Sequence, residues 1–139
     1  MNALRLPIIA ASLLLVALPA SAQEMKPGLW EITTTMKMQG MQMPGAKFTH
    51  CYTAQDISSG KQYKGDEASK CTISNLKTSG GSVSYDMACA ADGSKMAGSV
   101  KGTVSPTAYT FDQKIRMTPD QGMGEMHSTM NGRRVGDCK

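Results

Sequence analysis

The sequence predicts an all-β fold with minor α content. Two observations support it: short segments in which apolar and polar residues alternate, and turns rich in Gly, Pro and Asn between those segments. An even set of four cysteines also predicts two disulfides. We expect an antiparallel meander of about seven or eight strands that forms a curled sheet or a barrel-like half-shell. One short helix and two disulfides complete the expected architecture.

Residues 1–22 have the features of a signal peptide. Arg5 precedes an apolar run over residues 6–20, and Ala20-Ser21-Ala22 matches the small-x-small cleavage rule. The apolar run is too short to span a bilayer comfortably. We therefore expect a periplasmic or secreted protein that begins near Gln23, with a single β-domain over residues 23–139 and no membrane span in the mature chain.

The alternation is clearest in residues 28–38, where the even-numbered apolar residues share one side of a predicted strand. These residues are Trp30, Ile32, Met36 and Met38. We expect a Gly- and Met-rich loop over residues 39–45 and a second strand over residues 46–53. Thr53 suits the N-cap of a short helix that ends near Ile57, and the polar residues 61–69 predict an exposed loop.

Residues 71–78 and 82–89 predict a hairpin around Ser79-Gly80-Gly81, because Gly can take the left-handed position of a three-residue loop. In that register Cys71 faces Cys89, Ile73 faces Met87 and Asn75 faces Tyr85. Directly opposed β-carbons are close enough for a disulfide. In an oxidising compartment we therefore predict the bridge Cys71–Cys89 and, by elimination, the bridge Cys51–Cys138.

Two further hairpins are expected. The first joins residues 94–104 to 109–117, and its facing pairs are Gly98 with Ile115, Gly102 with Phe111, and Met96 with Met117. The glycines would leave space for the large side chains opposite them. Asn131-Gly132 is the strongest short turn signal in the sequence, and it predicts the tip of a last hairpin that joins 123–130 to 133–138.

These features resemble a family of small periplasmic bacterial proteins known as a domain of unknown function. The matching features are Pro27-Gly28-Leu29-Trp30-Glu31, the Met-rich segment 36–44, Cys51 before a short helix, Cys71 and Cys89, and the tail Gly136-Asp137-Cys138. Tyr52-Thr53-Ala54 departs from the Leu-Thr-Pro usual in that family. The resemblance covers essentially the whole mature chain. It implies an envelope location and an all-β domain, and it implies no activity.

Charge and motifs exclude several classes of function. The chain has 15 Lys and Arg against 11 Asp and Glu, scattered without a basic stripe interleaved with aromatics, so nucleic-acid binding is not expected. The cysteines contain no CxxC and are assigned to bridges. Neither a G-x-S-x-G elbow nor an HExxH motif occurs. We therefore predict a protein that is not an enzyme.

Methionine is unusually frequent, with 12 in the chain. The series Met36-x-Met38-x-x-Met41-x-Met43 is spaced like a flexible soft-metal site, because thioethers favour Cu(I). Core packing would account for Met36 and Met38, whereas Met41 and Met43 lie in the predicted loop. Near the C-terminus lies a second set, which comprises Met117, Met123, Met126, His127 and Met130.

Two binding functions follow. The first is binding of an apolar small molecule or an envelope protein partner, with a pocket lined by Trp30, Tyr85 and Tyr109 inside the curled sheet. A sheet filled by its own side chains is the alternative to that pocket. The second function is Cu(I) binding by Met41 and Met43 with Met36 and Met38. His50 and His127 are predicted on opposite faces of the sheet, so they are poor candidates for one metal site.

Overall fold

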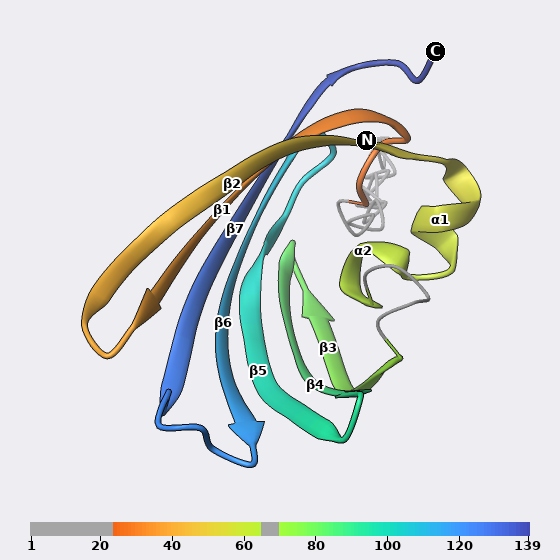
Figure 1. The fold of residues 1–139 in the computed structure, drawn as a ribbon. Coiled ribbons are helices and arrows are strands. Elements are labelled where there is room, and N and C mark those ends of the chain that lie inside the picture. The colour runs from red at the N-terminus through yellow and green to blue at the C-terminus, as the bar shows by residue number, and fades with distance from the viewer. Residues whose placement is uncertain (1–23, 65–69) are drawn as a thin grey trace, which may run out of the picture.

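The computed structural model describes residues 24–64 and 70–139 (Figure 1). Within these ranges seven strands form one curled sheet that does not close into a barrel, in the order β2-β1-β7-β6-β5-β4-β3, with every neighbouring pair antiparallel. The predicted meander is therefore confirmed. The strands are β1 (Gly28–Met38), β2 (Met41–Tyr52), β3 (Cys71–Ser79), β4 (Ser82–Ala91), β5 (Ser94–Val104), β6 (Ala108–Thr118) and β7 (Glu125–Gly136).

The β1–β2 hairpin is longer than predicted, because the expected loop over residues 39–45 is wrong. Only Gln39 and Gly40 form the turn, and both have positive φ. A β-bulge shifts the register between Thr34 and Met36. A β-carbon at Gly45 would lie 2.2 Å from the Thr34 carbonyl oxygen, so the bulge requires glycine there.

The β3–β4 hairpin has the predicted register at its cysteine end and a different one at its turn. Cys71 faces Cys89 and Ile73 faces Met87. A bulge between Ser74 and Lys77 then shifts the register, and Ser79 faces Ser82 across the two-residue turn Gly80-Gly81. The predicted pairing of Asn75 with Tyr85 across a three-residue loop is therefore wrong. Asn75 has a φ of 53° in the bulge, and its amide donates to Asp86 Oδ2 at 2.8 Å.

The β5–β6 hairpin has the predicted register, with Gly98 opposite Ile115, Gly102 opposite Phe111 and Met96 opposite Met117.

The predicted hairpin at Asn131-Gly132 is wrong, because both residues lie inside the continuous strand β7. A β-carbon at Gly132 would lie 2.1 Å from Cε1 of Tyr109. This glycine therefore makes space for a ring on the neighbouring strand and forms no turn.

Two short helices join β2 to β3. Helix α1 (Ala54–Ser58) begins where the sequence predicts, at a capping box in which Thr53 Oγ1 accepts from the Asp56 amide and Asp56 Oδ2 accepts from the Thr53 amide. Helix α2 (Lys61–Lys64) occupies the start of the predicted loop 61–69. Residues 65–69 of that loop lie outside the described residues, as does the predicted signal peptide, residues 1–22. Neither helix in the described ranges has the length or hydropathy needed to cross a bilayer.

The core is a ladder of aromatic rings on one face of the sheet, here called the core face. Trp30 stacks on Tyr109 with ring centroids 5.5 Å apart, and Tyr109 stacks on Phe111 at 4.9 Å. From α2, Tyr63 contacts both Tyr85 and Phe111 edge to face. Such pairs add to the free energy gained by burying the rings. The helices thereby cover part of the core face.

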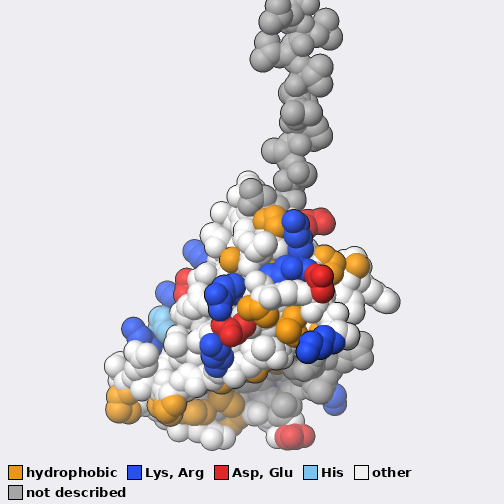
Figure 2. Space-filling model, turned by 90° about the horizontal axis from the view of Figure 1, so that it is seen from above, with side chains coloured by type: hydrophobic (Ala, Val, Ile, Leu, Met, Phe, Trp, Pro, Cys, Tyr) orange, Lys and Arg blue, Asp and Glu red, His pale blue; other side chains and the backbone are white. Residues whose placement is uncertain are grey.

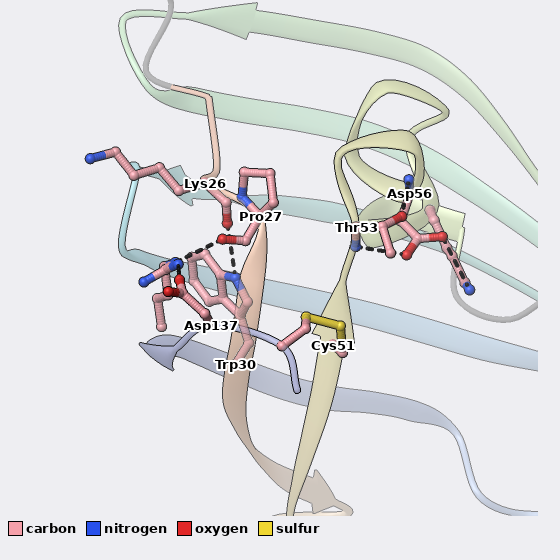
Figure 3. Close-up of a disulfide and its surroundings, with 10 residues drawn as sticks. Lys26, Pro27, Trp30, Cys51, Thr53, Asp56 and Asp137 are labelled. Carbon is pink, nitrogen blue, oxygen red and sulfur yellow. Dashed lines mark hydrogen bonds and ion pairs between the residues drawn. A yellow bond between two sulfur atoms is a disulfide. The ribbon is translucent and has the colours of Figure 1, made fainter.

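Both predicted disulfides are present. Cys71–Cys89 joins neighbouring strands, whereas Cys51–Cys138 joins β2 to the tail beyond β7. Leu29 of β1 faces Cys51 on one side and Gly136 on the other, so the second bridge ties together the two strands that flank β1. Next to this bridge the Trp30 indole donates to the Lys26 carbonyl at 3.1 Å (Figure 3).

Candidate functional site

The four methionines of the sequence motif lie together at the free end of the β1–β2 hairpin. Met36 faces Met43 and Met38 faces Met41, so each pair is directly opposed on neighbouring strands. Directly opposed side chains project from the same face of the sheet, with β-carbons about 4.5–5.5 Å apart. We call this group of Met36, Met38, Met41 and Met43 the methionine hairpin.

The bulge decides which face the methionine hairpin occupies. Side chains alternate along a strand, so a shift of one residue moves them to the other face. On β2, Met41 and Met43 are odd-numbered, whereas Phe48 beyond the bulge is even-numbered and faces Ile32 of the core. Because the bulge adds one residue to β2, the side chains of Met41 and Met43 project from the core face, as does that of Phe48.

A fifth thioether belongs to the same neighbourhood. Met126 of β7 faces Met38 of β1, and it is buried. The sequence placed Met126 in a separate C-terminal set. No local signal joins the two sets, because they meet only through the long-range pairing of β1 with β7. Within that second set, Met117 faces Met96 across β5 and β6.

Most of the methionine hairpin is accessible to solvent. Met41 is 61% exposed, Met43 39% and Met36 38%, and Met38 is half-buried. Core packing therefore does not explain why a methionine occupies position 41. In Figure 2 hydrophobic side chains gather along one edge of the visible face, while charged side chains are interspersed over the rest. Exposed apolar groups that cluster in this way commonly mark a binding surface.

The three residues predicted to line a pocket pack mainly against other rings. Trp30 is fully buried, and Tyr85 and Tyr109 are 4% and 3% exposed. Tyr109 stacks on Trp30, while Tyr85 makes edge contacts with Tyr63 and Phe111. Burial raises the pKa of both tyrosines well above the ordinary value. Tyr109 also borders a small surface pocket of about 240 Å³ next to Gly80 and Gly81.

Harder metal ligands do not gather in the part of the chain that the structure describes. There, no group of three or more His, Cys, Asp and Glu side chains is arranged to hold a metal ion. His50 faces Trp30 on the core face, and His127 faces Lys37 on the opposite face. The prediction that the histidines lie on opposite faces is confirmed.

Glu31 lies on the face opposite the core face, here called the outer face, and it has two basic partners. Glu31 lies 3.1 Å from Nζ of Lys47 and 3.0 Å from Nη2 of Arg133, on the strands either side of β1. These contacts, led by that of Lys47, hold the pKa of Glu31 below its ordinary value. Because the ion pairs are exposed to solvent, we assign them little stability.

Comparison with known proteins identifies the family of the chain. No curated protein and no solved structure matches it. The model of a family described as "Protein of unknown function (DUF3617)" matches residues 25–138. This agrees with the resemblance to a family of unknown function seen in the sequence. The chain belongs to the DUF3617 family.

Proposed function

We propose that this protein is a non-enzymatic binding protein of an oxidising compartment, the periplasm or the extracellular space, and that it binds Cu(I) through the methionine hairpin. One observation carries the proposal: the β1–β2 register sets four thioethers in two opposed pairs on one face. The β-carbons within each pair are about 4.5–5.5 Å apart, and the two pairs are about 7 Å apart along the strands. Met has three rotatable side-chain bonds, so four sulfur atoms at this spacing can converge on one ion.

The chemistry of the compartment favours thioethers over thiolates. All four cysteines of the chain are in disulfides, so no thiolate competes for a soft metal. A thioether has no proton to lose and is a soft ligand that selects Cu(I). The exposure of Met41 and Met43 gives an incoming ion direct access and suits a site that exchanges its metal.

The compartment is tested by recovering the native protein. Disulfides persist in oxidising compartments, and residues 1–22 have the features of a cleaved signal peptide. We expect the protein in the periplasmic or secreted fraction with an N-terminus near Gln23. A cytoplasmic protein that retains the leader would contradict this assignment.

The metal proposal is tested by anaerobic Cu(I) titration of the mature protein against a competing chelator. A variant with all four hairpin methionines changed to leucine keeps the apolar volume and removes the sulfur atoms. The matched control changes Met96 and Met117, an opposed pair on β5 and β6, to leucine. We expect stoichiometric uptake by the wild type and the control, and none by the hairpin variant. Absence of uptake at micromolar metal, or equal uptake by the hairpin variant, would refute the proposal.

A second candidate function rests on a different observation. One nearly continuous apolar row crosses all seven described strands at right angles, with one residue from each. In sheet order the row is Met41, Met38, Met126, Ile115, Gly98, Met87 and Ile73. Six strand spacings of about 4.8 Å give it a length of about 29 Å. In the middle of the sheet the next row toward the helices contains Ser128 and Gln113, so the apolar track is narrow there.

A long, narrow, flexible track suits a single acyl chain better than a flat protein surface, and Met-rich surfaces adapt to varied apolar partners. Strand addition by a protein is disfavoured at both sheet edges, because β2 contains Pro44 and β3 is bulged. A dansyl-labelled fatty acid should gain fluorescence with the wild type and lose it with Met87→Gln. The all-leucine hairpin variant should still bind this probe, because leucine remains apolar. Failure of the wild type to bind would exclude this candidate function.

A further inference from the structure

The outer face contains a groove that the metal proposal does not use. It has a volume of about 760 Å³, within the range of small-molecule sites. It crosses β1, β7, β6 and β5, and it is bounded at one end by Gln39 and Gly40 of the β1–β2 turn. Every lining residue except Gly40 has a polar or charged side chain, so a ligand with polar groups fits it.

Three lysines from three different strands line this outer groove: Lys37 of β1, Lys101 of β5 and Lys114 of β6. Lys37 and Lys114 both face His127 of β7, so they stand two strand spacings apart, about 10 Å. None of the three ammonium groups makes an ion pair within residues 24–64 and 70–139, whereas Lys47 and Lys61 elsewhere do.

The carboxylates of the outer groove are held by other partners. Glu125 lies 3.3 Å from Nε of Arg116 and 3.0 Å from Nε2 of His127. The pKa of Glu125 is lowered mainly by Arg116, and to a smaller extent by His127 and Lys114. Asp112 accepts a hydrogen bond from Thr129 Oγ1 at 2.8 Å and faces Lys101 without forming an ion pair. The lysines thus keep a local excess of positive charge.

Hydroxyl groups stand beside these cations. Thr35 of β1 faces Thr129 of β7, and Ser99 of β5 faces Lys114 of β6, all along the groove. Each hydroxyl can donate one hydrogen bond and accept others, which matches the hydroxyl groups of a polyol. An ammonium group contacts phosphate oxygens as a point charge with three donors.

We propose that the outer groove binds a phosphate ester of a polyol, with Lys37, Lys101 and Lys114 contacting the phosphate and the threonine and serine hydroxyls contacting the polyol. A soluble sugar phosphate and the glycerol phosphate headgroup of a lipid share this chemistry. This site is independent of the methionine hairpin, which lies on the core face.

The test is isothermal titration of the mature, disulfide-bonded protein with glucose 6-phosphate and with glucose. The variant Lys37→Gln, Lys101→Gln, Lys114→Gln removes the three charges. The control is Lys95→Gln, on the same strand and face as Lys101 but outside the groove. We expect the wild type and the control to bind glucose 6-phosphate and not glucose. The triple variant should bind at least about tenfold more weakly, the loss expected from one charge-assisted hydrogen bond.

The source of the phosphate is distinguished by co-sedimentation with vesicles of phosphatidylcholine, with or without phosphatidylglycerol. Binding to the phosphatidylglycerol vesicles that the triple variant loses would assign the groove to a lipid headgroup. Binding of glucose 6-phosphate alone would assign it to a soluble ester. If the wild type binds neither probe, or the triple variant binds as well as the wild type, the proposal is wrong. An equal loss of binding in Lys95→Gln would also overturn the proposal, because the loss would then reflect the net charge of the protein and not the groove.

Discussion

Removal of the Cys51–Cys138 bridge should destabilise the domain strongly, although one of its cysteines is exposed. The bridge joins β2 to the tail beyond β7, and the two residues are 87 positions apart. Cys51 is half-buried and Cys138 is exposed, so substitution of both by alanine removes little packing. The change in stability then arises mainly from the unfolded chain, which loses a cross-link.

The magnitude follows from the loop length. Chain entropy for a loop of 87 residues gives about 4.6 kcal/mol at 25 °C. A domain of this size has a total free energy of unfolding of about 5–15 kcal/mol. Loss of the bridge therefore removes a large fraction of the stability. The Cys71–Cys89 loop, with a separation of 18, gives about 3.2 kcal/mol by the same relation.

Urea denaturation of the wild type and of Cys51→Ala, Cys138→Ala measures this difference. We expect the free energy of unfolding to fall by about 4–5 kcal/mol. The m-value should rise, because the unfolded chain without the bridge exposes more surface. A loss below about 2 kcal/mol with an unchanged m-value would refute the view that the bridge acts by restricting the unfolded chain.

Three further predictions concern stability. Gly132→Ala should lower the free energy of unfolding, measured by urea denaturation, by about 1–3 kcal/mol, because the new β-carbon would clash with the Tyr109 ring. In the control Gly136→Ala the new β-carbon meets nothing within 4 Å, so the free energy of unfolding should change little. Equal losses in the two variants would contradict this explanation. Burial raises the pKa of Tyr85 in the folded state, so the free energy of unfolding should be constant below the ordinary tyrosine pKa of about 10 and fall as pH rises above it. Tyr85→Phe should make that fall shallower. An unchanged fall would argue against burial of Tyr85 as the cause. Ion pairs lower the pKa of Glu31 in the folded state, so its contribution to stability is present above the unfolded pKa and is lost as pH falls through the folded pKa. Glu31→Gln should therefore reduce the fall of the urea midpoint at acid pH. An unchanged fall would contradict this.

Local sequence patterns predicted the elements whose partners are close in the chain. The β5–β6 register followed from one turn and from glycines placed opposite large side chains. The Cys71–Cys89 bridge followed from a predicted hairpin register that is correct at that end. The helix at Thr53 followed from its capping residue. In each case the physical cause lies within a few residues of the element that it determines.

Two of the errors arose where a residue fits against a neighbouring strand. Gly132 gave a strong turn signal, yet it is glycine because the Tyr109 ring lies against it from β6. Gly45 and Pro44 indicated a loop, yet they belong to a bulged strand. A bulge depends on the fit between two strands, and neither strand alone specifies it. Glycine and proline therefore predicted a turn or loop in two places where they lie within strands, once at a bulge and once beside a large ring.

The candidate site was predicted in composition but not in arrangement. The sequence predicted Met36 and Met38 in a strand and Met41 and Met43 in a loop, whereas the structure places all four in opposed strand pairs beside Met126. That arrangement depends on the bulge, which returns Met41 and Met43 to the core face. The outer groove could not be predicted, because its lysines come from three strands and meet only through the sheet order.

X-ray absorption spectroscopy of the Cu(I)-loaded mature protein tests the central claim most directly. If the methionine hairpin holds the metal, the spectrum should report Cu(I) with sulfur neighbours and no nitrogen or oxygen ligand. The protein with leucine at the four hairpin positions should retain no metal, and the Met96→Leu, Met117→Leu protein should give the wild-type spectrum. A first shell of nitrogen or oxygen ligands, or the same sulfur shell in the hairpin variant, would contradict the assignment.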